Sequence, residues 1–198
     1  MHLNRIYFRA LSSVLAASLS AGLSFHSAMA EDMPDMQGMT GPASVSTQVQ
    51  IDRALSAGPA EITKGAKVVG TDAKGNAVTL RDGNNGFTCM PGNPSVIGQP
   101  AMCMDAASMQ WTADFEAHKP KPTNAVPGIT YMLAGATQRS DSNPYDKTSP
   151  AIKVGAHWMI LWPFDPKATG LPTKHKATGA YIMWAGTPYA HVHIMGHP

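Results

Sequence analysis

Apolar and polar residues alternate over short stretches through much of the chain, a pattern typical of half-buried β-strands. Six segments are predicted as strands on this basis: 60–69, 77–81, 128–134, 152–162, 179–184 and 189–195. Two long polar loops rich in Pro, Gly, Asp or Asn lie between them, at 137–150 and 163–178. Loops of this length in a compact domain are often where ligands bind.

One segment has helical periodicity instead. Ala107, Trp111 and Phe115 recur at every fourth residue and would share one helix face, with Asp105 as the N-cap. We therefore predict a helix over 106–118, and only a marginal helix around 45–55. The expected fold class is mainly β, an antiparallel β-sandwich or open barrel that carries one α-helix near 106–118.

The first thirty residues have the pattern of a secretory signal peptide. Arg5 and Arg9 supply a positive start, an apolar stretch covers 10–25, and the Ala-Met-Ala run at 28–30 offers small residues to a signal peptidase. Cleavage is predicted after Ala30. The segment is too short and too interrupted by Ser to predict a membrane span. We expect an exported, soluble bacterial protein, periplasmic or secreted, with no transmembrane segment in the mature chain.

Residues 31–58 are predicted to form a flexible tail, because the segment starts polar, is broken by Pro and Gly, and lacks core periodicity. Met33, Met36 and Met39 recur in it at every third residue. Three thioethers on a flexible segment would suit one Cu(I) ion. The favoured interpretation is an ordinary linker, since no His or Cys stands among them. A single β-rich domain is expected over 59–198.

The charge balance excludes two classes of partner. The 15 Lys and Arg residues include Arg5 and Arg9, so cleavage leaves 13 of them against 13 Asp and Glu, and the net charge falls from +2 to 0. A neutral mature chain has no electrostatic footprint for nucleic acid or for an anionic membrane surface. We expect no nucleic-acid partner; a metal ion or a small molecule is the expected ligand.

The sequence contains two cysteines, Cys89 and Cys103. In an exported protein such a pair is expected to form a disulfide. The bridge would close a loop of about 15 residues, rich in Pro and Gly, and would stabilise the fold by roughly 3 kcal/mol. The alternative is a reduced pair that donates thiolates to a soft metal, together with Met90, Met102 and Met104.

Histidine and methionine alternate with other residues on two of the predicted strands. His191, His193 and Met195 share one strand face, and His157 and Met159 share a face upstream. If these two strands pair in the right register, the five side chains meet. Imidazole and thioether together suit copper, and imidazole alone suits zinc. The predicted metal site, for copper before zinc, has two central ligands and three supporting ones: His157 and His191, and then His193, Met159 and Met195.

Other interpretations of these residues stay open. His and Met on a buried strand face also serve as ordinary core residues, hydrogen-bonded or packed. A second hypothesis is an enzyme of unknown reaction that uses His157 or His191 as acid or base, with Asp105 or Asp165 as the carboxylate partner. The sequence contains no G-x-S-x-G, P-loop or H-E-x-x-H motif that would name such a reaction. A third hypothesis is a structural or interaction module of the cell envelope that binds no metal.

Five segments together resemble a group of uncharacterised exported bacterial proteins: NGFTCMPG at 85–92, MCMD at 102–105, YMLAG at 131–135, GAHWM at 155–159 and WAGTPYAH at 184–191. The resemblance covers 59–198. It implies one exported domain and carries no activity over. It also implies that a site shared by the group would use His157 and His191, whereas His193, His197 and the Met-bearing tail would be particular to this chain.

Overall fold

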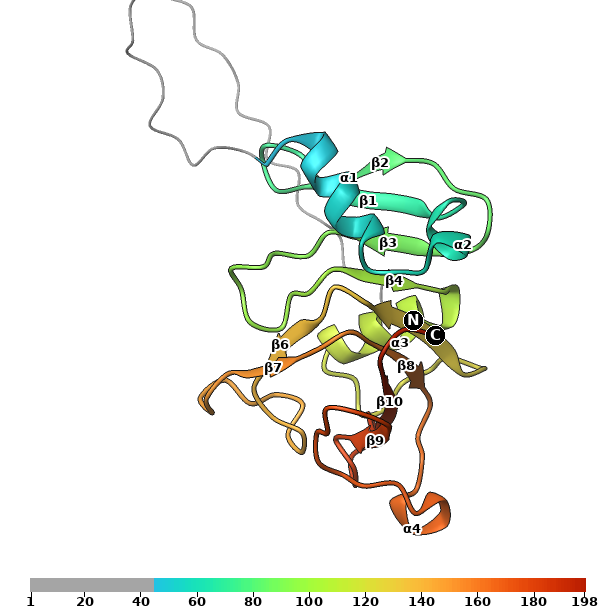
Figure 1. Ribbon diagram of the computed structural model, residues 1–198, viewed down its shortest axis with the longest axis vertical. Coiled ribbons are helices and arrows are strands. Elements are labelled where there is room, and N and C mark those ends of the chain that lie inside the picture. Colours follow the sequence, from blue (N-terminus) through green and yellow to red (C-terminus); the bar gives the residue numbers. More distant parts are fainter. Residues whose placement is uncertain (1–44) are drawn as a thin grey trace, which may run out of the picture. The chain divides into compact units, whose positions relative to one another are not determined.

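The computed structural model describes residues 45–198, which form a mainly β fold (Figure 1). The predicted signal peptide, its cleavage position after Ala30 and the methionines at 33, 36 and 39 lie outside the described residues. Within the described range, no helix is both long enough and apolar enough to cross a membrane.

Eight strands form one open sheet with the order β2-β1-β3-β4-β5-β8-β10-β9. Their bounds are Lys67–Thr71 (β1), Ala77–Arg81 (β2), Thr88–Met90 (β3), Met102–Met104 (β4), Gly128–Met132 (β5), His157–Leu161 (β8), Ala180–Met183 (β9) and His191–Met195 (β10). Neighbouring strands are antiparallel except β1 and β3, which run parallel. Two further strands, β6 (Ala136–Gln138) and β7 (Ile152–Val154), pair with each other in a separate ribbon. The mainly β class is confirmed, and the large sheet is mixed rather than purely antiparallel.

The two longer helices begin at polar caps. The predicted helix is present as α3 (Ala106–Glu116), and the Asp105 carboxylate accepts the N–H of Ser108 at 2.8 Å as its N-cap. The segment around 45–55 forms α1 (Thr47–Leu55), with Ser46 as N-cap. Ala54 and Ala57 in and after α1 are fully buried. The fold therefore starts before Pro59 and includes a segment that we expected in the tail, because alanines bury it without a strong apolar pattern.

Single-turn helices occupy two segments that were predicted as strand or loop. The predicted strand at 60–69 begins as α2 (Ala60–Thr63), with Pro59 as its N-cap in an extended conformation. The loop at 163–178 contains α4 (Pro166–Thr169), which ends at Gly170 with a positive φ of 70°. The predicted strand at 152–162 is likewise divided between β7 and β8.

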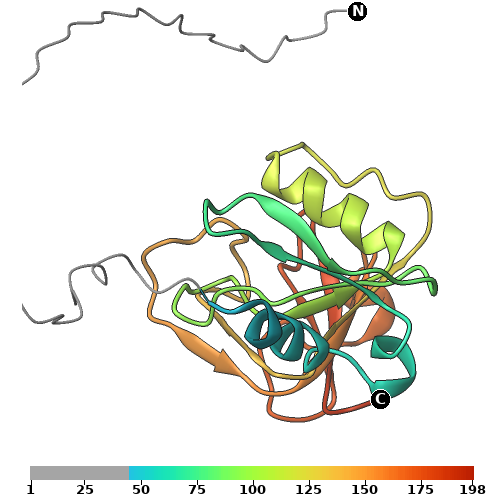
Figure 2. The same cartoon turned by 90° about the horizontal axis from the view of Figure 1, so that it is seen from above.

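The helices α1 and α3 cover opposite faces of the sheet (Figure 2). Because side chains alternate along a strand, the consecutive residues Cys103 and Met104 of β4 point to different faces. Cys103 packs in a cluster with Ala54 of α1. Met104 contacts α3 instead, where its sulfur accepts the hydroxyl of Thr112 at 3.5 Å. The face under α3 carries the candidate site, and the face under α1 carries the disulfide.

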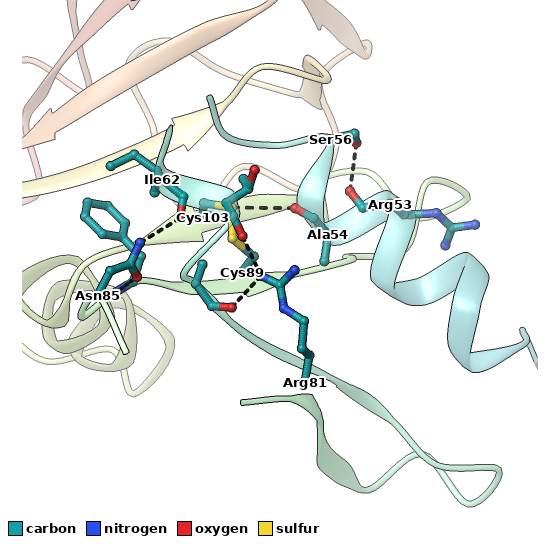
Figure 3. The surroundings of a disulfide bond; sticks show 11 residues. Arg53, Ala54, Ser56, Ile62, Arg81, Asn85, Cys89 and Cys103 are labelled. Atoms are coloured by element: carbon teal, nitrogen blue, oxygen red, sulfur yellow. Dashed lines mark hydrogen bonds between the residues drawn. A yellow bond between two sulfur atoms is a disulfide. The ribbon is translucent and has the colours of Figure 1, made fainter. Parts of the chain in front are cut away.

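The disulfide joins Cys89 of β3 to Cys103 of β4, which lie directly opposite each other in the antiparallel pair (Figure 3). Both sulfurs are fully buried. The Sγ atom of Cys103 contacts the carbonyl oxygen of Ala54 at 3.6 Å. Nearby, the guanidinium of Arg81 donates to the carbonyl oxygen of Ala66 at 2.6 Å. The predicted disulfide is confirmed, and the alternative of two thiolate ligands is wrong, because both sulfurs are used in the bond.

Removal of this disulfide should destabilise the protein. We expect the Cys89→Ala, Cys103→Ala double variant to lose roughly 2–4 kcal/mol of unfolding free energy, because the unfolded chain regains the freedom that the bridge removes. Urea denaturation of the variant and of the wild type measures the difference. Thiol titration of the unreduced wild type should find no free thiol; two titratable thiols would contradict the bridge.

Candidate functional site

A cavity of about 170 Å³ lies between α3 and the sheet face formed by β4, β5, β8, β9 and β10. Its walls are mostly apolar, and two residue types dominate the groups able to bind a ligand. These are three histidines and five methionines: His157, His191, His193, Met102, Met104, Met132, Met159 and Met183. We call this space the His/Met cavity.

The pairing of β8 with β10 brings these side chains together. His193 lies opposite Met159, and Met195 lies opposite His157. On the other side of β10, His191 lies opposite Met183 and His193 lies opposite Tyr181. Paired residues of an antiparallel sheet point to the same face. The juxtaposition of His157 and Met159 with His191 and His193, which the sequence predicted, is therefore present.

Each of the three imidazoles is anchored through its Nδ1 atom. The Nδ1 atom of His157 lies 2.8 Å from the carbonyl oxygen of Gly155, and that of His191 lies 2.9 Å from the carbonyl oxygen of Tyr189. A carbonyl oxygen only accepts hydrogen bonds, so both Nδ1 atoms carry a proton. In the neutral rings, Nε2 is therefore left with a free lone pair.

The Nε2 atoms of His191 and His193 face each other at 3.0 Å. Because Nε2 of neutral His191 can only accept, His193 donates its Nε2 proton to it. The Nδ1 atom of His193 then accepts the hydroxyl of Tyr181, 3.0 Å away. A directed chain of hydrogen bonds thus runs from Tyr181 through His193 and His191 to the backbone oxygen of Tyr189.

The third imidazole, His157, is stacked on His193 with ring centroids 4.8 Å apart and planes 11° from parallel. Its Nε2 atom is buried and has no hydrogen-bond partner. Two other buried polar atoms on residues that line the cavity also lack a partner, Nε1 of Trp111 and Oγ1 of Thr130. The cavity therefore retains hydrogen-bonding capacity that the protein does not satisfy.

Aromatic side chains close the cavity over His191. The rings of Trp111 and Trp184 each meet the imidazole edge-on, at centroid distances of 5.2 and 5.0 Å. Phe115 stacks on Trp184 at 5.1 Å. Trp184 has a positive φ of 55° and donates its indole N–H to the carbonyl oxygen of Ser140 at 3.1 Å. The long loop at 137–150 thereby fixes one wall of the site.

Burial keeps all three histidines neutral near pH 7. Desolvation lowers the pKa of His191 to about 4, although its bond to Tyr189 opposes the shift. The same cause lowers the pKa of His157, and it takes the pKa of His193 well below the ordinary value, with further lowering by the neighbouring imidazoles. Burial also raises the pKa of Tyr181, so its hydroxyl stays protonated. Neutral imidazoles are the form that binds metals.

Asp105 and Asp165, the two carboxylates suggested as acid–base partners of the histidines, bind backbone N–H groups instead. Asp105 accepts the N–H groups of Ser108 and Ile129 at 2.8 and 2.9 Å. Asp165 caps α4 by accepting the N–H of Lys167 at 2.8 Å. Across residues 45–198, no histidine ring makes a hydrogen bond to a carboxylate. The proposed pairing of His157 or His191 with these two acids is not formed.

Four of the five predicted ligands line one cavity. His157, His191, His193 and Met159 line the cavity, whereas Met195 shares their register but is not among the lining residues. Sequence reasoning missed Met183 and Tyr181. Their alternation along the predicted strand at 179–184 was the available signal, since both stand on the face that His191 and His193 share.

The histidines alone do not form a complete metal site. Among the described residues, no group of three or more His, Cys, Asp or Glu side chains is arranged to hold a metal ion. The stacking of His157 on His193 explains this, because a metal lies near the plane of each imidazole that binds it. Two nearly parallel rings 4.8 Å apart cannot both direct a lone pair at one point. A metal at the facing pair, His191 and His193, would need thioether ligands.

No protein-family model, curated protein or solved structure matches this chain. The fold and the site define a mainly β, disulfide-bonded protein with a buried His/Met cavity. Its function has to be inferred from that cavity.

The metal-free protein should lose stability as the pH falls from 6.5 towards 4. The unfolded histidines titrate near pH 6.5, whereas the folded ones titrate lower, so the unfolded chain takes up protons first. Each such histidine lowers the unfolding free energy by up to about 1.4 kcal/mol per pH unit in this range. Hydrogen bonds from Ser149 lower the pKa of Asp146 to about 2, so the protonation of this acid changes the unfolding free energy only below this pH range.

Urea denaturation at pH 7.5, 6.0 and 5.0 measures this loss. The His191→Phe variant should show a shallower pH dependence, whereas a His197→Ala control should keep the wild-type slope, because His197 is exposed. An unfolding free energy that stays constant from pH 7.5 to 5.0 would contradict the neutral, buried state of the cluster.

Proposed function

We propose that the mature protein binds one copper ion in the His/Met cavity, outside the cytoplasm. The observation that carries the proposal is that the Nε2 atoms of His191 and His193 face each other at 3.0 Å. The Nδ1 atom of each ring is held by a hydrogen bond, to the carbonyl oxygen of Tyr189 and to the hydroxyl of Tyr181 respectively. Metal-binding histidines characteristically donate their other ring nitrogen to a backbone carbonyl or a similar acceptor. Two nitrogens bound to one tetrahedral metal at 2.0–2.1 Å would lie roughly 3.3 Å apart. A small increase in the distance between the two Nε2 atoms would therefore let both of them bind one ion.

Metal entry requires the proton between the two rings to leave its position. The proton of His193 can move from Nε2 to Nδ1 once the O–H of Tyr181 turns away from Nδ1, and the Nδ1–H then donates to the hydroxyl oxygen of Tyr181, 3.0 Å away. His191 already has its proton on Nδ1. Both rings then direct a lone pair into the cavity without any change in net charge.

Copper is preferred over zinc because the cross-strand neighbours of both histidines are methionines, whose thioethers are soft donors. Met183 lies opposite His191, and Met159 lies opposite His193. His157 would support the site after rotation out of its stack on His193. This assignment keeps four of the five residues proposed from the sequence, replaces Met195 with Met183, and makes His191 and His193 the central pair in place of His157 and His191.

Export of the protein is supported by two features. The sequence pattern at 1–30 is that of a signal peptide, and the disulfide between Cys89 and Cys103 belongs in an oxidising compartment. We infer a periplasmic or secreted location, with Glu31 as the first residue of the mature chain.

Metal titration of the purified mature protein tests the proposal. We expect about one copper per chain, and saturation at a hundred times the Kd should raise the unfolding free energy by about 2.7 kcal/mol. Copper should also quench the fluorescence of Trp111 and Trp184, whose rings contact His191. Replacement of both central ligands, His191→Phe with His193→Phe, should abolish binding.

A His197→Ala variant is the matched control, since this histidine is exposed near the same end of the chain. It should bind copper as the wild type does. If the buried double variant fails to fold, the thermal shift and tryptophan quenching of the wild type still decide the question. A wild-type protein with neither retained nor titratable copper or zinc contradicts the proposal.

The unpartnered polar atoms favour a second candidate, the binding of a small uncharged molecule. Trp111 offers an N–H donor, and His157 offers an Nε2 acceptor, because its Nδ1 proton is already donated to Gly155. An apolar cavity of about 150 Å³ accommodates a benzene-sized ligand, and the His/Met cavity is of this size. A single-ring molecule with one donor and one acceptor would match the walls.

Phenol and toluene, compared on the metal-free protein, separate this candidate from simple apolar filling. If the candidate is correct, phenol binds at least tenfold more tightly than toluene, because only phenol satisfies the Nε2 atom of His157. Quenching of tryptophan fluorescence and calorimetry report the binding. Equal affinities, or no binding of either compound, would contradict it.

A further inference from the structure

The nitrogen and sulfur donors that line the His/Met cavity are electrically neutral. They comprise three imidazoles and five thioethers, and the single carboxylate among the lining residues, Glu116, is exposed. The lining includes no Lys or Arg. Asp141 is not among the lining residues, but its negative charge contributes to the raised pKa of Tyr181. Its carboxylate accepts hydrogen bonds from the side-chain amide of Gln138 at 2.8 Å and from the backbone N–H of His175 at 2.9 Å.

A neutral donor set in an apolar enclosure discriminates between ions by their charge. The cost of moving an ion from water into a medium of low dielectric constant grows with the square of its charge. A divalent ion therefore loses about four times as much hydration energy as a monovalent ion of the same size. Sites for divalent ions usually offset this cost with carboxylate or thiolate charges, whereas the only carboxylate that lines this cavity, that of Glu116, is exposed to solvent.

From these features we infer that the His/Met cavity is selective for Cu(I) over both Cu(II) and Zn(II). The inference rests on the proposed function and adds the oxidation state of the metal. Thioether sulfur is a soft donor that suits Cu(I), so ligand type and ligand charge select the same ion.

The register of the sheet identifies the two thioethers that complete the site. Met183 is the cross-strand neighbour of His191 on β9, and Met159 is the neighbour of His193 on β8. Both are buried and line the cavity. Met104 also lines it, but its sulfur already accepts the hydroxyl of Thr112 at 3.5 Å. Two imidazoles and two thioethers give four neutral ligands.

Competition with chromophoric chelators, without oxygen for Cu(I), measures the preference on the full mature protein. We expect Cu(I) to be bound at least about 100-fold more tightly than Zn(II) at the same pH, and more tightly than Cu(II). X-ray absorption of the Cu(I) protein should detect both nitrogen and sulfur neighbours. The Met159→Leu and Met183→Leu variants should each weaken Cu(I) binding at least roughly tenfold and lose part of the sulfur scattering, and the double variant should lose all of it.

Met109→Leu is the matched control, because it makes the same replacement at an exposed methionine of α3 that does not line the cavity. It should leave the Cu(I) affinity within about threefold of the wild type. Binding of Zn(II) or Cu(II) as tight as that of Cu(I), or a Cu(I) spectrum without sulfur, overturns the selectivity and leaves the proposed metal site intact. Failure to bind any of the three ions overturns both.

Discussion

In the antiparallel pair of β8 and β10, His193 lies opposite Met159, and Met195 lies opposite His157. The meeting of His157 and Met159 with the histidines of β10 follows from this register. A slip by one residue would move the side chains of one strand to the other face, exchanging His191 and His193 for Val192 and Ile194. The same alternation separates the site from the disulfide, because Cys103 faces α1 and Met104 faces α3.

The burial of three histidines on one sheet face affects both the stability of the protein and the protonation state of the site. Desolvation lowers their pKa values, so the cluster opposes folding at acidic pH. The same burial keeps the imidazoles neutral, while the bonds to Gly155, Tyr189 and Tyr181 fix their orientation. Aromatic rings of α3 and of the turn after β9 then cover His191. The protein thereby fixes the neutral charge and the orientation of these side chains.

Alternation along the strands was sufficient to predict the mainly β class and the shared face of His191 and His193, and a four-residue periodicity predicted the helix capped by Asp105. Alternation was not sufficient to predict which histidines meet, because strand pairing is non-local. Ring orientation depends on backbone carbonyls such as that of Gly155 and on Tyr181 from a third strand. The early start of the fold at α1 was missed because its buried residues are alanines, and the parallel β1–β3 pair left no local signal.

The central claim is that two anchored, neutral imidazoles direct their Nε2 atoms at one another and receive a metal there. Long-range proton–nitrogen correlation NMR of labelled protein at pH 7 tests it directly. The account predicts that His157 and His191 are protonated on Nδ1 alone, and that added Cu(I) shifts the Nε2 resonances of His191 and His193. Protonated imidazolium rings, a proton on Nε2 of His191, or Nε2 resonances unchanged by Cu(I) would contradict it.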